Sequence, residues 1–588
     1  MFVYSPQAYT LFHSHYGQTM KNRAIFISCL SPFILLFALL VNAGDNPPQA
    51  AIATAHPLAT QAGRDILNTG GNAFDAAVAI TAVLGVVEPY GSGLGGGGFW
   101  LLHRNADNFQ VMVDGREKAP MAAHRDMYLD DKGEVIPGAS INGPLAAGIP
   151  GVPAAMAHIA KKYGRLSLAK NLAPAIRLAR GGFKVDKQYR RYAEMRLKTL
   201  QRFPSAAKIF LHDNDVPPLG YRLKQEDLAN TLESIARHGT ADFYRGALAK
   251  RLVDGVKKAG GIWSLDDLKN YRIVEREPVR THYRGMKLIS AAPPSSGGIA
   301  LASMLRMLEQ YDLEKMADVD RAHLIIEVMR RAYRDRAEYL GDSDFVNVPV
   351  TRLTSAAHAR EWVKGIRMDE ATPSTALKPV GEPGGAGSDT THFSILDKEG
   401  NRVAATLSVN YLFGACFVVP GTGFLLNDEM DDFSAKPGVA NAYGLIGAEA
   451  NAIEPGKRPL SSMSPTFLED NRGVAIIGTP GGSRIISMVL LAALHYAAGA
   501  DASSLVQLPR FHHQYMPDTV MFENNAFSEK AEQELELRGH VLKKQMSPYG
   551  GGFGHYGNMQ GIVWNTQKNK VTAASDERGI GAAVVFGQ

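Results

Sequence analysis

The chain has 588 residues, 45% of them hydrophobic and 21% charged, and a formal net charge of +5. This composition is that of a globular protein, and the length suits a large multi-layer domain or two domains rather than one simple core. The small net charge and the lack of a basic run with interleaved aromatic residues give no indication of a nucleic-acid partner.

The N-terminus has the pattern of a secretory signal peptide. Lys21 and Arg23 precede an apolar run over residues 24–43, which ends in the small-residue sequence VNA. We therefore expect residues 1–43 to form a signal peptide that is cut after Ala43. A retained signal anchor is the alternative, because the run is nearly long enough to span a bilayer.

Two cysteines occur in the chain, Cys29 and Cys416. Cys29 would leave with the signal peptide, so the mature protein is expected to have no intrachain disulfide and no metal site built on cysteine. No later segment looks transmembrane. We therefore expect a periplasmic or secreted protein that has no membrane contact after signal removal.

The first third of the chain predicts buried elements. Residues 54–69 resemble a helix, and Asn72 with Asp75 forms a capping box that opens a second, strongly apolar helix. Residues 91–98 contain G-x-G-x-x-G, but here a helix precedes and a strand follows, the reverse of a dinucleotide site. We expect these glycines to let a buried strand approach neighbouring backbone closely.

The next part predicts mostly helices. Residues 107–120 favour a strand followed by a loop, with Arg116 just past the strand end, where a lone arginine is usually a solvated group. Helices are expected within residues 153–183 and 222–275, and residues 320–340 favour a charged amphipathic helix. The acidic and histidine pairs further on lack the spacing or geometry of metal ligands.

The most informative stretch lies between a loose leader and a hairpin. Residues 372–389 are rich in Pro, Gly and small polar residues, a composition typical of a linker. Residues 391–396 and 402–410 then favour two strands joined by a turn. If the turn is centred on Glu399, residue i lies opposite residue 798 − i.

In this register Thr390 faces Ser408, and Asn410 lies just beyond. A cut before Thr390 would give it a free α-amino group, whose pKa of about 7.7 to 8.0 suits a general base that activates the hydroxyl of the same residue. Its branched Cβ would hold that hydroxyl in few orientations. The alternative is an ordinary hairpin after a Gly/Pro loop.

Three later motifs contain candidate polar groups. They are an acidic run at residues 427–433, a serine-rich loop at 460–465, and a Gly-Gly turn at 478–484 that opens a helix. Backbone N–H groups at such a turn are good donors to an anion. Neither a G-x-S-x-G elbow nor a Walker P-loop occurs, which removes the main support for a serine hydrolase or a nucleoside triphosphatase.

Taken in order, the motifs resemble those of the γ-glutamyltranspeptidases, from about residue 50 to about residue 580. In the first half they are GGNAFDAAVA from residue 70, EPYGSGLGGGGF from 88 and DGRE from 114. In the second half they are DTTHFS from 389, NDEMDDFSAKPGV from 427, KRPLSSMSPT from 457, GTPGGSRI from 478, LPRFHHQ from 508 and ASDER from 574.

This resemblance implies an α+β protein with the four-layer αββα sandwich of the N-terminal-nucleophile (Ntn) hydrolases. A precursor of this kind cuts itself, and by similarity the cut falls between Asp389 and Thr390. A large subunit of residues 44–389 and a small subunit of residues 390–588 would stay associated as a heterodimer. No cofactor and no metal are implied.

The resemblance also implies a role for each candidate site residue. Those implied in the chemical step are the nucleophile Thr390, the hydroxyl-orienting Ser408, and the oxyanion-hole amides of Gly481 and Gly482. Those implied in holding the α-carboxylate of a γ-glutamyl substrate are Arg116, Ser461 and Ser462. Those implied in holding its α-ammonium are Asn410, Glu429 and Asp432. Tyr443 resembles a lid residue.

Two positions vary within the family. Ser408 stands where many members have threonine, and Glu429 stands where some have glutamine. The implied substrates are glutathione and other γ-glutamyl compounds, with water, amino acids or dipeptides as acceptors. A related acylase on the same scaffold, acting for example on a glutaryl amide, is an alternative, as is an inactive secreted binding protein.

Overall fold

The computed structural model describes residues 46–377, 390–436, 438–439, 441, 445, 447–545 and 556–587. The predicted signal peptide, Asp389 and Tyr443 lie outside the described residues. Residues from Asn46 to Gln588 belong to one compact unit. Within the described part, no helix combines the length and hydrophobicity needed to cross a membrane.

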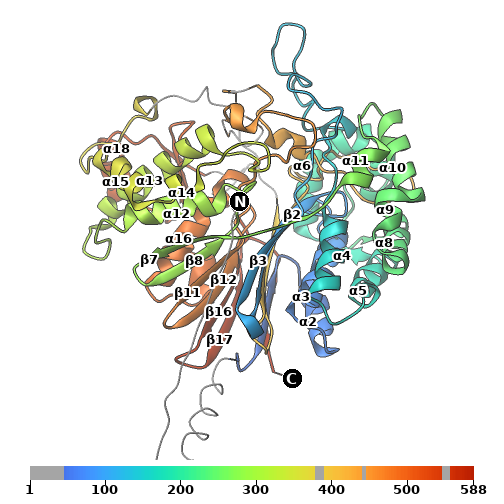
Figure 1. Ribbon diagram of the computed structural model, residues 1–588, viewed down its shortest axis with the longest axis horizontal. Coiled ribbons are helices and arrows are strands. Elements are labelled where there is room, and N and C mark those ends of the chain that lie inside the picture. The colour runs from blue at the N-terminus through green and yellow to red at the C-terminus, as the bar shows by residue number, and fades with distance from the viewer. Residues whose placement is uncertain are drawn as a thin grey trace, which may run out of the picture. The chain divides into compact units, whose positions relative to one another are not determined.

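Two large sheets form the centre of the described structure (Figure 1). In spatial order, the seven-stranded sheet consists of β18 (Ala582–Phe586), β1 (Ala50–Thr54), β9 (Thr391–Leu396), β10 (Arg402–Ser408), β2 (Gly97–Arg104), β3 (Phe109–Asp114) and β6 (Val274–Arg276). The six-stranded sheet consists of β17 (Lys570–Ser575), β16 (Gln560–Asn565), β12 (Gly473–Gly478), β11 (Thr466–Asp470), β8 (Met286–Ser290) and β7 (Val279–Tyr283). Their paired strands are antiparallel.

Helices cover the outer face of each sheet, which gives four layers (Figure 1). Those on the side of the seven-stranded sheet are α2 (Pro57–Asn68), α3 (Ala73–Val87), α4 (Val152–Lys162), α5 (Leu168–Gly181), α6 (Lys187–Arg202), α7 (Pro204–Phe210), α8 (Glu226–His238), α9 (Ala241–Arg245), α10 (Ala247–Lys258) and α11 (Leu265–Asn270). Those on the other side are α12 (Gly297–Leu308), α13 (Asp318–Tyr339), α14 (Val350–Leu353), α15 (Ala356–Lys364), α16 (Ile485–Ala497), α17 (Ala502–Gln507) and α18 (Glu529–Leu537). The predicted αββα sandwich is confirmed.

Two small sheets are separate from the large ones. One consists of β13 (Phe511–His512), β14 (Val520–Phe522) and β15 (Leu542–Lys544), and the other of β4 (Phe183–Lys184) and β5 (Arg222–Leu223).

Strand β2 shows why the sandwich forms. Trp100 and Leu102 belong to the core beneath helices α2 to α5, whereas Phe99 and Leu101 belong to the core between the two sheets. Since successive side chains of a strand point to opposite faces, a strand buried on both faces needs a continuous apolar run. The sequence FWLL meets this requirement.

The predicted hairpin has the expected register. Strand β9 pairs with β10 from Leu396 opposite Arg402 to Thr391 opposite Leu407, which is the 798 − i relation. One step further, Thr390 comes opposite Ser408. Strand β10 ends there, two residues before the predicted end, because Asn410 has a left-handed φ of 74° that no strand continues through.

The glycine run after α3 allows the close approach that its composition predicts. A Cβ on Gly95 would lie 2.0 Å from the carbonyl oxygen of Leu425, and one on Gly96 would lie 2.1 Å from that of Ser408. The Asn72–Asp75 capping box at the start of α3 is also present.

Two predicted elements differ in detail. The helix expected over residues 54–69 begins only at Pro57, because Thr54 is the last residue of β1 and pairs with Phe393 and Ala582, far away in sequence. Helix α13 has the predicted position, but its arginines are largely buried rather than solvated. The first difference arises from strand partners that are far away in sequence.

Candidate functional site

One small cavity brings together most of the predicted site residues. It has a volume of about 20 Å³, and its lining residues are Arg116, Thr390, Ser408, Asn410, Glu429, Asp432, Leu445, Ser461, Ser462, Met463, Gly482, Ser483 and Ile485. This volume holds about one water molecule. Gly481 adjoins the lining at Gly482, whereas the structure does not describe Asp389 and Tyr443.

Thr390 lies at the start of β9, close to the end of β10. The backbone of Gly91 lies against it, since a Cβ on Gly91 would be 3.6 Å from the Thr390 carbonyl oxygen. The Oγ of Ser408 accepts a hydrogen bond from the N–H of Asn410 at 2.7 Å. The side-chain amide of Asn410 donates a hydrogen bond to the carbonyl oxygen of Asp428 at 3.0 Å. This bond joins the hairpin to the acidic run at residues 427–433.

Next to Thr390, the side chain of Thr391 is held by a buried carboxyl group. Its Oγ1 donates to Glu88 at 2.8 Å, and the Tyr90 hydroxyl donates to the other Glu88 oxygen at 3.2 Å. Burial raises the pKa of Glu88 to about 7. These bonds fix the end of α3 against the first residues of β9.

Arg116 is buried and has two carboxylate partners. Its Nη1 donates to Glu429 and its Nη2 to Asp432, while Nε and Nη2 also donate to the carbonyl oxygens of Pro459 and Leu460, each at 3.2 Å. The general expectation of a solvated arginine at this position is therefore wrong. The residues implied for the two charged ends of one substrate are ion-paired with each other.

The carboxyl groups outnumber the arginine that they surround. Burial would lower the pKa of Arg116, but Glu429, Asp432 and Glu117 raise it above its usual value. Burial raises the pKa of Glu429 to about 7 against the attraction of Arg116, and it raises the pKa of Asp432 as well. Burial also raises the pKa of Glu117 well above its ordinary range. Burial therefore favours the protonated forms of these carboxyl groups, whereas Arg116 favours their ionised forms.

The serine-rich loop contains two hydroxyl groups whose oxygens each accept a hydrogen bond from an N–H group. Ser461 Oγ accepts from the N–H of Met463 at 3.1 Å, and Ser462 Oγ accepts from Arg336 Nη2 at 3.2 Å. Because an N–H group occupies an acceptor site of each oxygen, each hydroxyl proton is available to donate to another group. The loop is suited to bind an anion.

The Gly-Gly turn has the backbone that an oxyanion hole needs. Gly481 and Gly482 have φ values of 142° and 57°, which few other residues adopt, and helix α16 follows after one short 3₁₀ turn (Gly482–Arg484). Among the described residues, neither N–H group donates to a backbone or side-chain acceptor. Both are thus available to a reacting oxygen.

The residues that we did not expect to bind metal have other partners. His512 contacts Ser487 at 2.7 Å, and His513 contacts Asp518 at 3.0 Å. Asp342 accepts from the N–H of Arg458 at 2.8 Å. Among the described residues, no group of three potential ligands is arranged to hold a metal ion.

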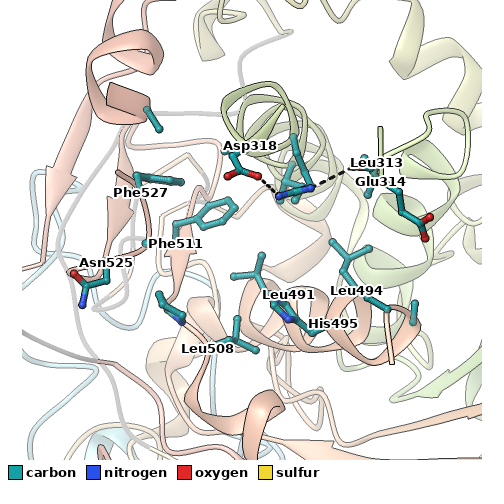
Figure 2. Close-up of a pocket in the computed structure, with 18 of the residues that line it drawn as sticks. Leu313, Glu314, Asp318, Leu491, Leu494, His495, Leu508, Phe511, Asn525 and Phe527 are labelled. Carbon is teal, nitrogen blue, oxygen red and sulfur yellow. Dashed lines mark hydrogen bonds and ion pairs between the residues drawn. The ribbon is translucent and has the colours of Figure 1, made fainter. Parts of the chain in front are cut away.

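A larger cavity of about 1030 Å³ lies elsewhere, between the first turns of α13, the last turns of α16 and the segment around Phe527. Figure 2 shows Phe511 and Phe527 across this cavity from Leu491 and Leu494. It contains none of the predicted site residues, so its size does not make it the reaction site.

Sequence reasoning missed two residues of the site. Glu117 lies 3.7 Å from Arg116 and is fully buried, and its position next to Arg116 in the DGRE motif could have indicated it. Arg336 lies behind Ser462, but nothing in the sequence of α13 distinguishes it from the other arginines of that helix.

The chain is similar to known proteins over most of its length. The family described as gamma-glutamyltranspeptidase matches residues 59–586. A glutathione hydrolase proenzyme of Pseudomonas sp. (strain A14) is 42% identical, over 88% of this chain and 92% of its own length. Among solved structures, Helicobacter pylori gamma-glutamyltranspeptidase is 41% identical with a TM-score of 0.54, over 55% of this chain and 94% of that chain. A cephalosporin acylase from Bacillus halodurans is 27% identical with a TM-score of 0.80, over 92% and 97%.

Proposed function

Since this chain belongs to the γ-glutamyltranspeptidase family, we propose that it cuts itself between Asp389 and Thr390 and then acts as a γ-glutamyltransferase and glutathione hydrolase. It transfers the γ-glutamyl group of glutathione and other γ-glutamyl amides to water or to an amino acid or dipeptide. The observation that carries this proposal is the shared cavity, where Thr390 lies with a cation, two carboxyl groups and paired serine hydroxyls.

The charged groups match the two ends of a glutamyl substrate. Its α-carboxylate binds to Arg116 and to the Ser461 and Ser462 hydroxyls, because a guanidinium suits bidentate carboxylate binding. Its α-ammonium binds to the carboxyl groups of Glu429 and Asp432 and to the side chain of Asn410. Since Arg116 is paired with those carboxylates in the structure, binding exchanges one set of ion pairs for another and widens the cavity.

Thr390 performs the transfer in two steps. Its Oγ attacks the γ-carbonyl carbon while its α-amino group takes the hydroxyl proton, and the Gly481 and Gly482 N–H groups hold the resulting oxyanion. The proton passes to the leaving nitrogen, the C–N bond breaks, and a γ-glutamyl ester of Thr390 remains. Water or an amine then attacks the ester carbon, and its proton returns through the α-amino group to Thr390 Oγ.

Self-cleavage uses the same hydroxyl in the precursor. Thr390 Oγ attacks the carbonyl carbon of Asp389, the peptide C–N bond breaks, and the nitrogen gains the proton. Water then hydrolyses the ester, which leaves a carboxylate on Asp389 and a free amine on Thr390. The products are a large subunit of residues 44–389 and a small subunit of residues 390–588, associated as a heterodimer.

This association has support in the fold. Strand β9 of the proposed small subunit lies between β1 of the large subunit and β10, so one sheet contains both. The apolar run at the N-terminus supports export to the periplasm or medium, with removal of residues 1–43.

A related acylase is the second candidate, because the cephalosporin acylase shares the fold over most of both chains. An acylase for glutaryl amides has no use for an ammonium site. The carboxyl groups of the buried Glu429 and the half-buried Asp432 therefore favour the γ-glutamyl substrate.

A gel and an assay test the proposal together. The mature chain should run as two bands on a denaturing gel and release p-nitroaniline from γ-glutamyl-p-nitroanilide, faster with glycylglycine. The Thr390→Ala variant should remain one band and show no turnover. An uncut wild-type chain would refute the processing, and a cut protein that acts only on the glutaryl analogue would favour the acylase.

A further inference from the structure

One arginine of helix α13 differs from its neighbours. Arg330 and Arg331 both pair with Glu327, and Arg334 pairs with Asp335 at 3.3 Å. Arg336 is equally buried, with 4% of its surface exposed, but the described part of the chain shows no carboxylate ion-paired with it. Burial lowers the pKa of Arg336, and the more distant charge of Asp432 only partly offsets this effect. Burying a cation without a close ion pair is costly, so a function that needs this charge is the natural explanation.

The contacts of Arg336 lead directly to the serine-rich loop. Its Nε donates to Ser296 Oγ at 3.0 Å, and its Nη2 donates to Ser462 Oγ at 3.2 Å. Ser296 Oγ in turn donates to the carbonyl oxygen of Ser461 at 2.7 Å. The Arg336 guanidinium therefore contacts the serine-rich loop directly at Ser462 and, through Ser296, at Ser461.

The direction of these bonds sets the direction of the Ser462 hydroxyl. A guanidinium donates only, so Ser462 Oγ is the acceptor, and its own proton is available on the cavity side. Without Arg336, the Ser462 hydroxyl could rotate to another acceptor. With it, the hydroxyl is held as a donor to an anion.

Arg336 also provides positive charge to a substrate carboxylate where the charge of Arg116 is already paired. Arg116 is neutralised by Glu429 and Asp432, and Glu117 lies 3.7 Å away. An approaching carboxylate therefore meets little net positive charge at Arg116 until those pairs separate. Arg336 has no carboxylate in close ion-pair contact among the described residues, although Asp432 interacts with it at longer range, so it adds positive charge behind Ser462.

We infer that Arg336 is a positioning residue for the substrate α-carboxylate, acting by orienting the Ser462 hydroxyl and by adding a second buried positive charge to this subsite. The inference rests on the proposed function, because it assumes that the glutamyl carboxylate binds at Ser461 and Ser462. Arg336 acts on the strength and selectivity of binding rather than on bond breaking.

The test compares two competitive inhibitors of γ-glutamyl-p-nitroanilide turnover. L-Glutamate has an α-carboxylate, and L-isoglutamine has a neutral carboxamide of the same shape in its place. In Arg336→Met we expect the KM and the glutamate Ki to rise about tenfold or more, with kcat and the isoglutamine Ki changing less than about threefold, because a charge-assisted interaction is lost. Arg336→Lys should recover part of the glutamate affinity.

Two further variants separate positioning from general stability. If Arg336 acts through Ser462, Arg336→Met should raise the glutamate Ki much less in a Ser462→Ala background than in the wild type. Arg331→Met removes a buried arginine of the same helix and should leave the ratio of the two Ki values unchanged.

The outcomes are distinguishable from failure of the proposed function. If the wild type does not turn over γ-glutamyl-p-nitroanilide, the proposed function fails. If it does, but Arg336→Met raises both Ki values equally or adds fully to Ser462→Ala, the inference fails. If Arg336→Met does not mature, Arg336→Lys decides: its glutamate Ki should still rise selectively, and unchanged selectivity would refute the inference.

Discussion

The raised pKa of Glu429 leads to a pH dependence that a single substitution isolates. Burial raises this pKa to about 7, although Arg116 attracts the negative form. If Glu429 holds the substrate ammonium, only its ionised form contributes the charge. Glutamine has the same shape and no titration, so Glu429→Gln removes the charge at every pH.

The magnitude follows from the fraction ionised. With a pKa of about 7, roughly 1% of Glu429 is charged at pH 5, half at pH 7 and about 99% at pH 9. The ratio of wild-type to variant kcat/KM should therefore rise up to about 100-fold from pH 5 to pH 9. The α-amino group of Thr390 and the substrate ammonium titrate in both proteins, so their effects cancel in this ratio.

The assay is steady-state hydrolysis of γ-glutamyl-p-nitroanilide at half-unit pH steps. Each sample is returned to pH 8 afterwards to show that no activity was lost irreversibly. Glu449→Gln provides a control with the same charge change at an exposed residue that pairs with Arg125, and its ratio should stay flat. A flat ratio for Glu429→Gln would refute the assignment of Glu429 to the ammonium.

The pH dependence of the free energy of unfolding gives a second test of the raised pKa of Glu429. The folded pKa of about 7 exceeds the ordinary value of 4.5, so the folded state holds the proton more tightly. Wild-type stability should therefore fall relative to Glu429→Gln as the pH rises from about 4.5 to 7 and then level off, by about 3 kcal/mol in total. A stability difference independent of pH would contradict the raised pKa.

Three substitutions test other parts of the structure. Gly481→Ala should lower kcat about 100- to 1000-fold with little change in KM, because alanine disfavours a φ of 142° and the change displaces an oxyanion donor. An unchanged kcat would show that the glycine pair has no part in the mechanism. Gly478→Ala places a Cβ 2.2 Å from the buried ring of His392, so the melting temperature and the extent of self-cleavage should both fall. The control Gly181→Ala adds a Cβ in open space and should match the wild type. Asn72→Ala removes the N-cap of α3 and should cost about 1 kcal/mol of stability or more in denaturant unfolding; no loss would mean that water replaces the cap.

Local chemistry made much of the site predictable from the sequence. The hairpin register depends on one short turn, and the capping box on four consecutive residues, so both could be worked out without the rest of the chain. The left-handed Gly481 and Gly482 likewise follow from a short glycine turn before a helix. The roles of Arg116, Glu429 and Asp432 came from the family resemblance, since no local rule joins residues so far apart in sequence.

Tertiary structure decided which charges meet. Arg116 is more than 300 residues from Glu429, and only the packed sandwich brings them into an ion pair. Arg336 has the same local context as the other arginines of α13, yet it alone among them reaches Ser462. The sequence by itself determined which polar groups exist and how nearby residues are oriented. The fold determined their partners and burial, and these set the pKa of Glu429 and the available charge of Arg336, because desolvation and Coulomb interactions depend on atoms that are distant in the chain.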